Sequence, residues 1–274
     1  MIIHHHDSDF ARYAELLGVR REQPSITALA RVVRTHMTSV PFENVSKLYR
    51  LKTSGLWGIP DLAQYLEGIE RFHFGGTCYS NNYYVGELLR FLGYDIRLCG
   101  ADMSKPDVHM MNIVNVEGRE FIVDAGYGAP FLEPLPCDLP VDYVISSGND
   151  RYVLKPKNGL GRSELQLHRD GAFAHRYLVN PMSRTIDEFA GVILDSFSPE
   201  ATFMNAILLV KCEPERTIVV HNMTCIENRG TTTERKVVES LEQLIQTIHD
   251  IFLMPRAIVE TALDGLMLTR DAWN

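Results

Sequence analysis

The spacing of apolar residues changes near Tyr94 from a helical period to alternation, and this change constrains the fold more than any other feature. Before Tyr94, apolar residues recur every three or four positions, which is typical of helices that bury one face. We expect helices within residues 7–36, around 60–69, and from Cys78 to a stop at Gly93. The first third of the chain is therefore predicted to be helical.

After Tyr94, apolar and polar residues alternate, as expected for strands with one buried face. The predicted strands cover 96–100, 108–116 and 119–124, with shorter ones near 151–155, 164–168 and 173–178. This middle third is expected to form an antiparallel sheet or a small barrel. The last third combines predicted strands at 205–211, 216–221 and 233–238 with a helix over 240–253 and a short final helix.

These patterns predict a multi-domain α/β (α+β) protein divided into residues 1–93, 94–198 and 199–274. A chain of 274 residues is long enough for more than one hydrophobic core. The 27 Lys and Arg residues are outnumbered by 35 Asp and Glu residues, and the net charge of −8 argues against nucleic acid or an anionic membrane as the main partner. No apolar run approaches the length of a membrane span.

Cysteine usage points to a reducing compartment. The chain has five cysteines, an odd number, and no two of them have C-x-x-C spacing. This pattern argues against a zinc site or a secreted disulfide framework. We therefore expect a cytoplasmic protein without a metal site.

The segment Gly75-Gly76-Thr77-Cys78 stands directly before a predicted helix. Cys78 is therefore expected at a helix N-terminus, where unpaired backbone N–H groups and the helix dipole favour a thiolate. The glycines leave room for a substrate to approach the sulfur. A buried structural cysteine is the alternative interpretation, because free cysteine is among the most buried residue types.

A two-residue turn at Glu117-Gly118 predicts the register of a hairpin. Residues 116 and 119 then pair, and the same register makes His109 a diagonal neighbour of Asp124 on one face of the sheet. Such neighbours lie about 7–8 Å apart by backbone, within reach of a hydrogen bond between imidazole and carboxylate. A register shifted by one residue would separate them.

Cys78, His109 and Asp124 supply the residue types of a nucleophile, its base and an orienting group. The His109–Asp124 pair alone would also fit an ordinary strand histidine beside an acidic residue. An upstream cysteine at a helix start favours the catalytic interpretation. His73 is a second candidate close to the cysteine, but it precedes the glycine turn.

These residues and several other segments resemble the arylamine N-acetyltransferase family. The matching motifs are P-F-E-N at 41–44, G-G-x-C-x-x-x-N at 75–82, V-D-x-G-x-G at 123–128 and S-P-x-x-x-F at 198–203. They occur in the order of the family, and their combination is specific although each motif alone is weak.

The resemblance implies a helical bundle, a β-barrel and an α/β lid around a cysteine-protease-like Cys-His-Asp core. It also implies ping-pong transfer without a metal ion. Cys78 would take an acetyl group from acetyl-CoA and pass it to an arylamine, arylhydrazine or N-hydroxyarylamine. His109 would be the base and Asp124 its orienting group.

The resemblance further implies contacts with both substrates. Gly126 and Gly128 match a glycine-bearing loop that approaches the CoA phosphates, where absent side chains permit close backbone contact. Phe42, Tyr127 and Phe203 match aromatic positions near the acceptor pocket. Each of these aromatic residues could equally be part of a hydrophobic core.

Three positions depart from the family pattern. Phe74 stands where an Arg usually precedes the two glycines, Ser80 replaces a common Glu or Gln, and Leu16 replaces a frequent Arg. Glu43 then lacks its usual cationic neighbour. Because a buried unpaired carboxylate is costly, we expect Arg71 or another group to compensate, or Glu43 to be exposed.

Two other functions fit the same residues. A transglutaminase-like cysteine hydrolase shares the Cys-His-Asp order, and dependence on an acyl-CoA donor would distinguish it. A binding protein that keeps the fold but lost turnover through Phe74 and Ser80 would form no acetyl adduct. The physiological acceptor and the length of the acyl donor are left open by the sequence.

Overall fold

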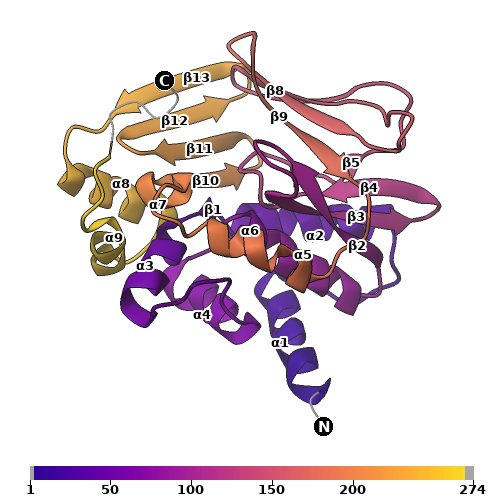
Figure 1. Ribbon diagram of the computed structural model, residues 1–274, viewed down its shortest axis with the longest axis horizontal. Helices are drawn as coiled ribbons and strands as arrows, with labels where there is room; N and C mark the ends of the chain where they lie inside the picture. The colour runs from indigo at the N-terminus through magenta and orange to yellow at the C-terminus, as the bar shows by residue number, and fades with distance from the viewer. Residues whose placement is uncertain (1–2, 269–274) are drawn as a thin grey trace.

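A computed structural model describes residues 3–268 of the protein. The helices of the first third run through the lower and middle parts of Figure 1, below and beside the strands of two antiparallel sheets. The predicted mixed α/β (α+β) fold class is confirmed. Among the residues described, no helix is both long and apolar enough to span a membrane.

Five helices make up the first third of the chain. They are α1 (Ile3–Leu16), α2 (Ile26–Ser39), α3 (Val45–Ser54), α4 (Leu62–Phe72) and α5 (Cys78–Phe91). Ser25 caps α2 by accepting a hydrogen bond from Ala28 N, and Asp61 begins α4 with a capping box. The sequence pattern does not predict α3, because its apolar face is short and the proline at 41 marks the preceding segment as a break.

The middle third forms an eight-stranded sheet that nearly closes into a barrel. Its strands are β2 (Asp95–Asp102), β3 (His109–Val116), β4 (Arg119–Val123), β5 (Leu135–Pro136), β6 (Tyr143–Ser147), β7 (Asp150–Leu154), β8 (Glu164–Arg169) and β9 (Ala172–Asn180). Their order is β5-β4-β3-β2-β9-β8-β7-β6. The short strands β5 and β6 are not predicted by the sequence pattern.

The hairpin of β3 and β4 has the predicted register. Val116 pairs with Arg119, and Asn112 pairs with Val123. Glu117 and Gly118 both adopt positive φ, at 52° and 74°. Positive φ at both central residues is typical of a type I′ turn, which matches the twist of the strands in a two-residue hairpin. The residues beyond the end of β4 are therefore placed as the sequence argument requires.

A second, five-stranded sheet joins the two ends of the chain. It contains β1 (Phe42–Glu43), β10 (Leu208–Glu213), β11 (Arg216–His221), β12 (Thr224–Arg229) and β13 (Thr232–Val237), in that order. The sequence pattern does not predict β12. The helices α8 (Leu241–Phe252) and α9 (Arg256–Leu263) follow as expected. Because β1 pairs with β10, the first and last thirds of the chain share one sheet. The predicted division into domains after residues 93 and 198 stays a prediction.

A short helical segment links the two sheets. It comprises the 3₁₀ helix η1 (Ile186–Phe189), α6 (Ala190–Asp195) and α7 (Thr202–Asn205). Phe189, Ile193 and Phe197 from this segment are buried in one cluster with Cys78 and Tyr79 of α5. The segment therefore covers the start of α5.

Asn44 connects the first third of the chain to the second sheet. Its buried amide donates to the carbonyls of Phe203 at 3.0 Å and Ala206 at 2.6 Å, and its oxygen accepts from Leu208 N at 2.9 Å. One side chain thus satisfies three buried backbone groups at the end of α7 and the start of β10. The start of β10 is fixed in position beside β1 by these bonds.

We predict that Asn44→Ala lowers the free energy of unfolding by about 2–4 kcal/mol, because it leaves buried backbone groups without partners. Chemical denaturation monitored by circular dichroism measures this change. Asn115→Ala is the matched control: Asn115 bonds to Asp95 at the surface, and its loss should cost less than about 0.5 kcal/mol. Equal effects of the two substitutions would contradict the assigned role of Asn44.

Candidate active site

Cys78 is the first residue of α5, as the sequence predicts. Strand β1 holds the loop that leads into it: Phe42 forms a parallel bridge with Gly76, and Glu43 N donates to Gly76 O at 3.0 Å. The residue is buried, at 7% exposure. The thiol therefore belongs to a helix start whose N–H groups lack intrahelical partners, an environment that favours an anion.

His109 and Asp124 are joined by a hydrogen bond. His109 is the first residue of β3, and Asp124 follows the last residue of β4. Nε2 of His109 and Oδ2 of Asp124 lie 2.8 Å apart, and both residues are 3% exposed. The proximity predicted from the hairpin register is confirmed. The bond to Nε2 leaves Nδ1 of the imidazole available for another partner.

Asp124 accepts three further hydrogen bonds. Oδ1 accepts from Asn82 Nδ2 at 2.9 Å and from Gly126 N at 3.0 Å, while Oδ2 also accepts from the hydroxyl of Tyr177 at 3.0 Å. The sequence analysis assigns no role to Asn82 or Tyr177. Asn82 lies one helical turn after Cys78, which could have indicated it, whereas Tyr177 on β9 has no local sequence indication.

The charges of the site favour an ion pair. Burial raises the pKa of Asp124, but the charge and hydrogen bond of His109 and the bonds from Asn82 and Gly126 outweigh it, so the pKa is lowered overall. Burial likewise lowers the pKa of His109. The charge of Asp124 and its hydrogen bond to His109 oppose this effect, and so do the hydrogen bond and the charge of Cys78. Together they raise the pKa of His109 to about 10. The imidazole is therefore held protonated between a carboxylate and the thiol.

Gly126 lies directly against α5. A Cβ atom there would come within 2.9 Å of Cys78 Cβ, and closer still to Cys78 Cα. Gly128 has a φ of +74°, a backbone conformation that favours glycine. Packing against Cys78 therefore requires a glycine at position 126. The contacts of Gly126 and Gly128 with CoA stay predictions.

The three predicted aromatic residues lie in two places. Phe42 and Phe203 form an edge-to-face pair with ring centroids 5.7 Å apart, next to α7. The Tyr127 ring lies 5.9 Å from the His109 ring and is stacked on Phe131 at 5.9 Å. The structure therefore brings Tyr127 next to the triad residues and places Phe42 beside Phe203.

Glu43 is fully buried, and backbone groups rather than Arg71 compensate its charge. Its oxygens accept from Ser46 N at 2.8 Å and Gly75 N at 3.0 Å. Arg71 pairs instead with Glu67 at the surface. Of the three alternatives, compensation by Arg71 and exposure of Glu43 are wrong, and compensation by another group is confirmed. Burial raises the pKa of Glu43 despite these bonds. The charge of Glu43 in turn opposes the lowering of the Arg50 pKa that burial causes.

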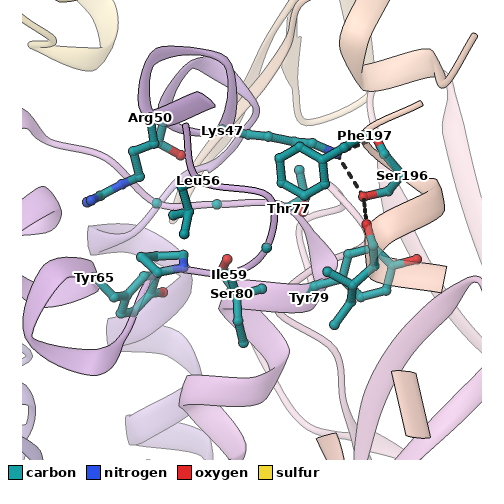
Figure 2. Close-up of a pocket in the computed structure, with 16 residues that line it drawn as sticks. Lys47, Arg50, Leu56, Ile59, Tyr65, Thr77, Tyr79, Ser80, Ser196 and Phe197 are labelled. Carbon is teal, nitrogen blue, oxygen red and sulfur yellow. Dashed lines mark hydrogen bonds between the residues drawn. The ribbon is translucent and has the colours of Figure 1, made fainter. Parts of the chain in front are cut away.

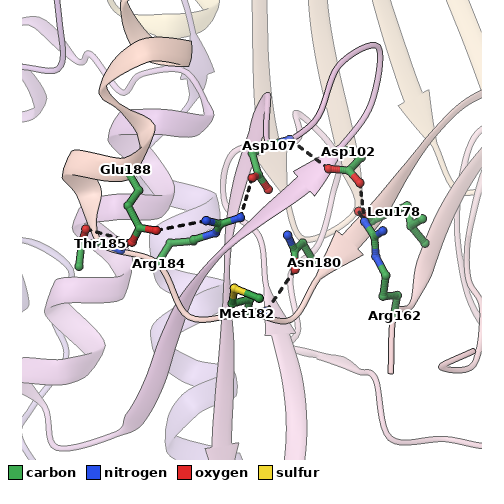
Figure 3. A network of polar contacts seen from close by, with 9 residues as sticks. All are labelled: Asp102, Asp107, Arg162, Leu178, Asn180, Met182, Arg184, Thr185 and Glu188. Carbon is green, nitrogen blue, oxygen red and sulfur yellow. Dashed lines mark hydrogen bonds and ion pairs between the residues drawn. The ribbon is translucent and has the colours of Figure 1, made fainter. Parts of the chain in front are cut away.

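A polar network fixes the loop that precedes His109 (Figure 3). Asp107 has a positive φ of 53° and donates its backbone N–H to Asp102 Oδ1 at 3.0 Å. Arg184 binds Asp107 Oδ2 at 2.9 Å and Glu188 at 3.1 Å, while Arg162 binds Asp102. The linking segment after β9 is therefore tied to the loop at the start of β3.

Comparison with known proteins identifies the family of the chain. The sequence model of the N-acetyltransferase family matches residues 25–258. The chain belongs to the arylamine N-acetyltransferase family. The three residues of the proposed triad all lie within the matched region of this N-acetyltransferase.

Individual relatives cover different shares of the chain. An N-malonyltransferase, FDB2 of Fusarium pseudograminearum, is 31% identical over 126 residues, which cover 39% of this chain and 36% of that protein. An arylamine N-acetyltransferase of Mycolicibacterium smegmatis is 24% identical over 257 residues, covering 89% of this chain and 91% of that one. The Mycobacterium marinum enzyme, solved in complex with CoA, has a TM-score of 0.78 at 20% identity over 94% of this chain and 99% of its own. The last comparison shows a shared fold.

We predict that His109 titrates near pH 10 in the folded protein, because the Asp124 carboxylate raises its pKa. Asp124→Asn should lower this pKa, since burial continues to disfavour the imidazolium. Histidine ¹⁵N NMR across pH measures both values, and His36, whose pKa burial lowers to about 3, serves as the control. A wild-type value near 6.5 would contradict the ion pair.

The same shift fixes a pH dependence of stability. The pKa of His109 in the folded protein lies above its value near 6.5 in the unfolded chain. The ion pair with Asp124 therefore contributes its full stabilisation of the folded state below about pH 6.5. It is lost as pH rises through about 10.

Cys78 should be the thiol that alkylates first at pH 7. Burial raises the pKa of Cys99 to about 12, of Cys137 to about 11 and of Cys212 to about 12, and it also raises the pKa of Cys225. Limited iodoacetamide labelling with peptide mapping measures the order. Faster labelling of Cys225, the most accessible of the five, would contradict the special environment of Cys78.

Proposed function

We propose that this protein is an acetyl-CoA-dependent acetyltransferase that carries the acetyl group on Cys78. The acceptor is an arylamine, arylhydrazine or N-hydroxyarylamine. His109 acts as acid and base, and Asp124 orients it. The observation that carries the proposal is the 2.8 Å bond between buried His109 and Asp124, with Cys78 at the start of α5 interacting with the same imidazole.

The first half-reaction needs only these residues and the donor. The Cys78 thiolate attacks the carbonyl carbon of acetyl-CoA, and the bond to the CoA sulfur breaks. The imidazolium of His109 gives its proton to the departing CoA thiolate. The products are a Cys78 thioester, free CoA and a neutral imidazole.

The second half-reaction restores the starting state. The amine nitrogen attacks the thioester carbonyl, His109 takes the proton that the amine loses, and the Cys78 thiolate departs. Asp124, with its three other donors, holds the imidazole in one orientation through both steps. The charge on the carboxylate stabilises the imidazolium that forms again.

The surroundings of Cys78 suit a thioester that must survive until an amine arrives. Phe189, Ile193 and Phe197 pack in one buried cluster with Cys78 and Tyr79. Exclusion of water by such groups slows hydrolysis of a reactive intermediate. This feature favours acyl transfer over the hydrolase alternative.

Substrate contacts follow the family pattern. Gly126 and Gly128 are proposed to approach CoA, and Tyr127, Phe42 and Phe203 to contact the aromatic acceptor; the closeness of Tyr127 to His109 supports its role. A malonyl donor is a further possibility, because one relative is an N-malonyltransferase. The five free cysteines agree with a cytoplasmic location.

We predict ping-pong kinetics, because the acetyl group occupies Cys78 between two half-reactions. Double-reciprocal plots at several fixed amine concentrations should be parallel. Mixing enzyme with acetyl-CoA alone should release a burst of CoA equal to the enzyme present, with one acetyl group on Cys78 by intact mass and peptide mapping.

Cys78→Ser is the control, and it should show neither burst nor adduct. Intersecting plots without a burst would indicate direct transfer in a ternary complex and overturn the role of Cys78. Continuous CoA release without an acceptor would indicate a hydrolase. Donor binding without any release would indicate a binding protein.

A further inference from the structure

The tyrosine that follows Cys78 is bonded to the backbone beside the base. Tyr79 is buried, and its hydroxyl donates to the carbonyl oxygen of Val108 at 3.0 Å. Val108 is the residue immediately before His109, the first residue of β3. A side chain next to the nucleophile therefore holds the main chain next to the base.

The Tyr79 hydroxyl has a second carbonyl nearby, but the geometry favours Val108. The carbonyl oxygen of Val192 in α6 lies 3.5 Å from the hydroxyl, which is longer than an ordinary O–H···O hydrogen bond. Val192 O also accepts a hydrogen bond from Ser196 N at 3.1 Å. Because a tyrosine hydroxyl has a single hydrogen to donate, we assign that hydrogen to Val108.

A second side chain of α5 makes the corresponding bond on the other side of His109. Asn82 Nδ2 donates to the carbonyl oxygen of Met110 at 2.5 Å. Tyr79 and Asn82 are three residues apart, so they share one face of the helix. Both residues that flank His109 are thus bonded through their carbonyls to the helix that begins with Cys78. Helix α5 therefore sets where the base stands relative to the nucleophile.

The same helix is packed closely against β3 further along its length. A Cβ atom at Gly86 would come within 2.4 Å of Asn112 Oδ1, and Asn112 Nδ2 donates to the carbonyl of Asn82 at 2.7 Å. These contacts hold the middle of α5 on the strand. The bond of Tyr79 adds a support at the first turn of the helix, where Cys78 lies.

The ring of Tyr79 is held independently of its hydroxyl. Tyr79 lines a cavity of about 30 Å³ at the start of α5, and Figure 2 shows it on the side of this cavity next to Ser196 and Phe197. Its ring belongs to a buried cluster with Phe189, Ile193 and Phe197. A variant that lacks only the hydroxyl should therefore keep the ring in place.

We propose that Tyr79 is a positioning residue for the acyl-transfer reaction: its hydroxyl fixes the backbone before His109, so that the imidazolium can give its proton to the departing CoA sulfur. The inference rests on the proposed thioester chemistry. Tyr79 takes part in no bond change: the Cys78–acyl bond forms, the acyl–CoA bond breaks, and the proton passes from His109 to CoA. Proton donation needs hydrogen-bond distance, and a misplacement of about 1 Å can cost roughly a hundredfold in rate.

The experiment compares two acetyl donors on Tyr79→Phe, which removes one oxygen atom. Acetyl-CoA has a basic thiolate leaving group that needs the proton of His109, whereas the weakly basic phenolate of p-nitrophenyl acetate leaves without one. Maximal rates of Cys78 acetylation are measured in single turnovers at saturating donor, by product release and intact mass. We expect the ratio of the acetyl-CoA rate to the p-nitrophenyl acetate rate to fall about tenfold or more.

Tyr84→Phe is the matched control. Tyr84 is also buried on α5, and its hydroxyl also donates to a backbone carbonyl, that of Pro60. The substitution removes the same atom and the same kind of bond from a part of the helix that does not hold the backbone beside His109. It should leave the ratio of the two rates unchanged, and any loss of folded protein cancels in that ratio.

The outcomes separate the two proposals. An unchanged ratio in Tyr79→Phe overturns the positioning role and leaves the proposed function standing. An equal fall in Tyr84→Phe also overturns it, because the loss of any anchoring hydroxyl on α5 would then suffice. No acetylation of wild-type Cys78 from either donor overturns the proposed function and this inference together. Tyr79→Met also lacks the hydroxyl and should lower the ratio to the same extent, so it decides the question if Tyr79→Phe does not fold.

Discussion

The buried carboxylate of Asp124 is the interaction on which the rest of the site depends. A charge removed from water must be balanced by donors, and four groups supply them from separate parts of the chain: His109, Asn82, Gly126 and Tyr177. These donors belong to the start of β3, the first turns of α5, the loop after β4, and β9. Their convergence requires that helix α5 and the eight-stranded sheet are packed together, so the site and the fold form as one unit.

Much of the fold was accessible from local patterns. The apolar spacing of α5 and the Glu117-Gly118 turn each act within a few residues, and each feature occurs as predicted. The pattern fails at α3 and β12. At the start of α3, the side chain of Asn44 does not cap the helix and instead donates a hydrogen bond to the carbonyl of Phe203, in the segment before β10. In β12, alternating polar residues give little apolar contrast, and pairing with neighbours defines the strand.

The candidate site divides in the same way. His109 and Asp124 are brought together by a two-residue turn, so their contact follows from sequence alone. Tyr177 reaches Asp124 from 53 positions away, and no local rule places it. The compensation of Glu43 also escapes sequence reasoning, because backbone N–H groups of Ser46 and Gly75 carry it, and a backbone donor is not marked by a polar side chain in the sequence. Side-chain motifs reveal acids and bases, whereas backbone donors become visible only in the folded chain.

The departure at Phe74 shows how charge can move between elements while the site is kept. Phe74 is buried at 2% exposure, and the guanidinium of Arg50 lies 5.9 Å from its ring centre. The cation nearest this ring therefore belongs to α3, and its pKa is influenced by the charge of Glu43. Lys47 and Arg50 lie three residues apart and so share one face of that helix. An Arg at position 74 beside Arg50 would set two cations against one buried carboxylate, so the residues at 50 and 74 are energetically coupled.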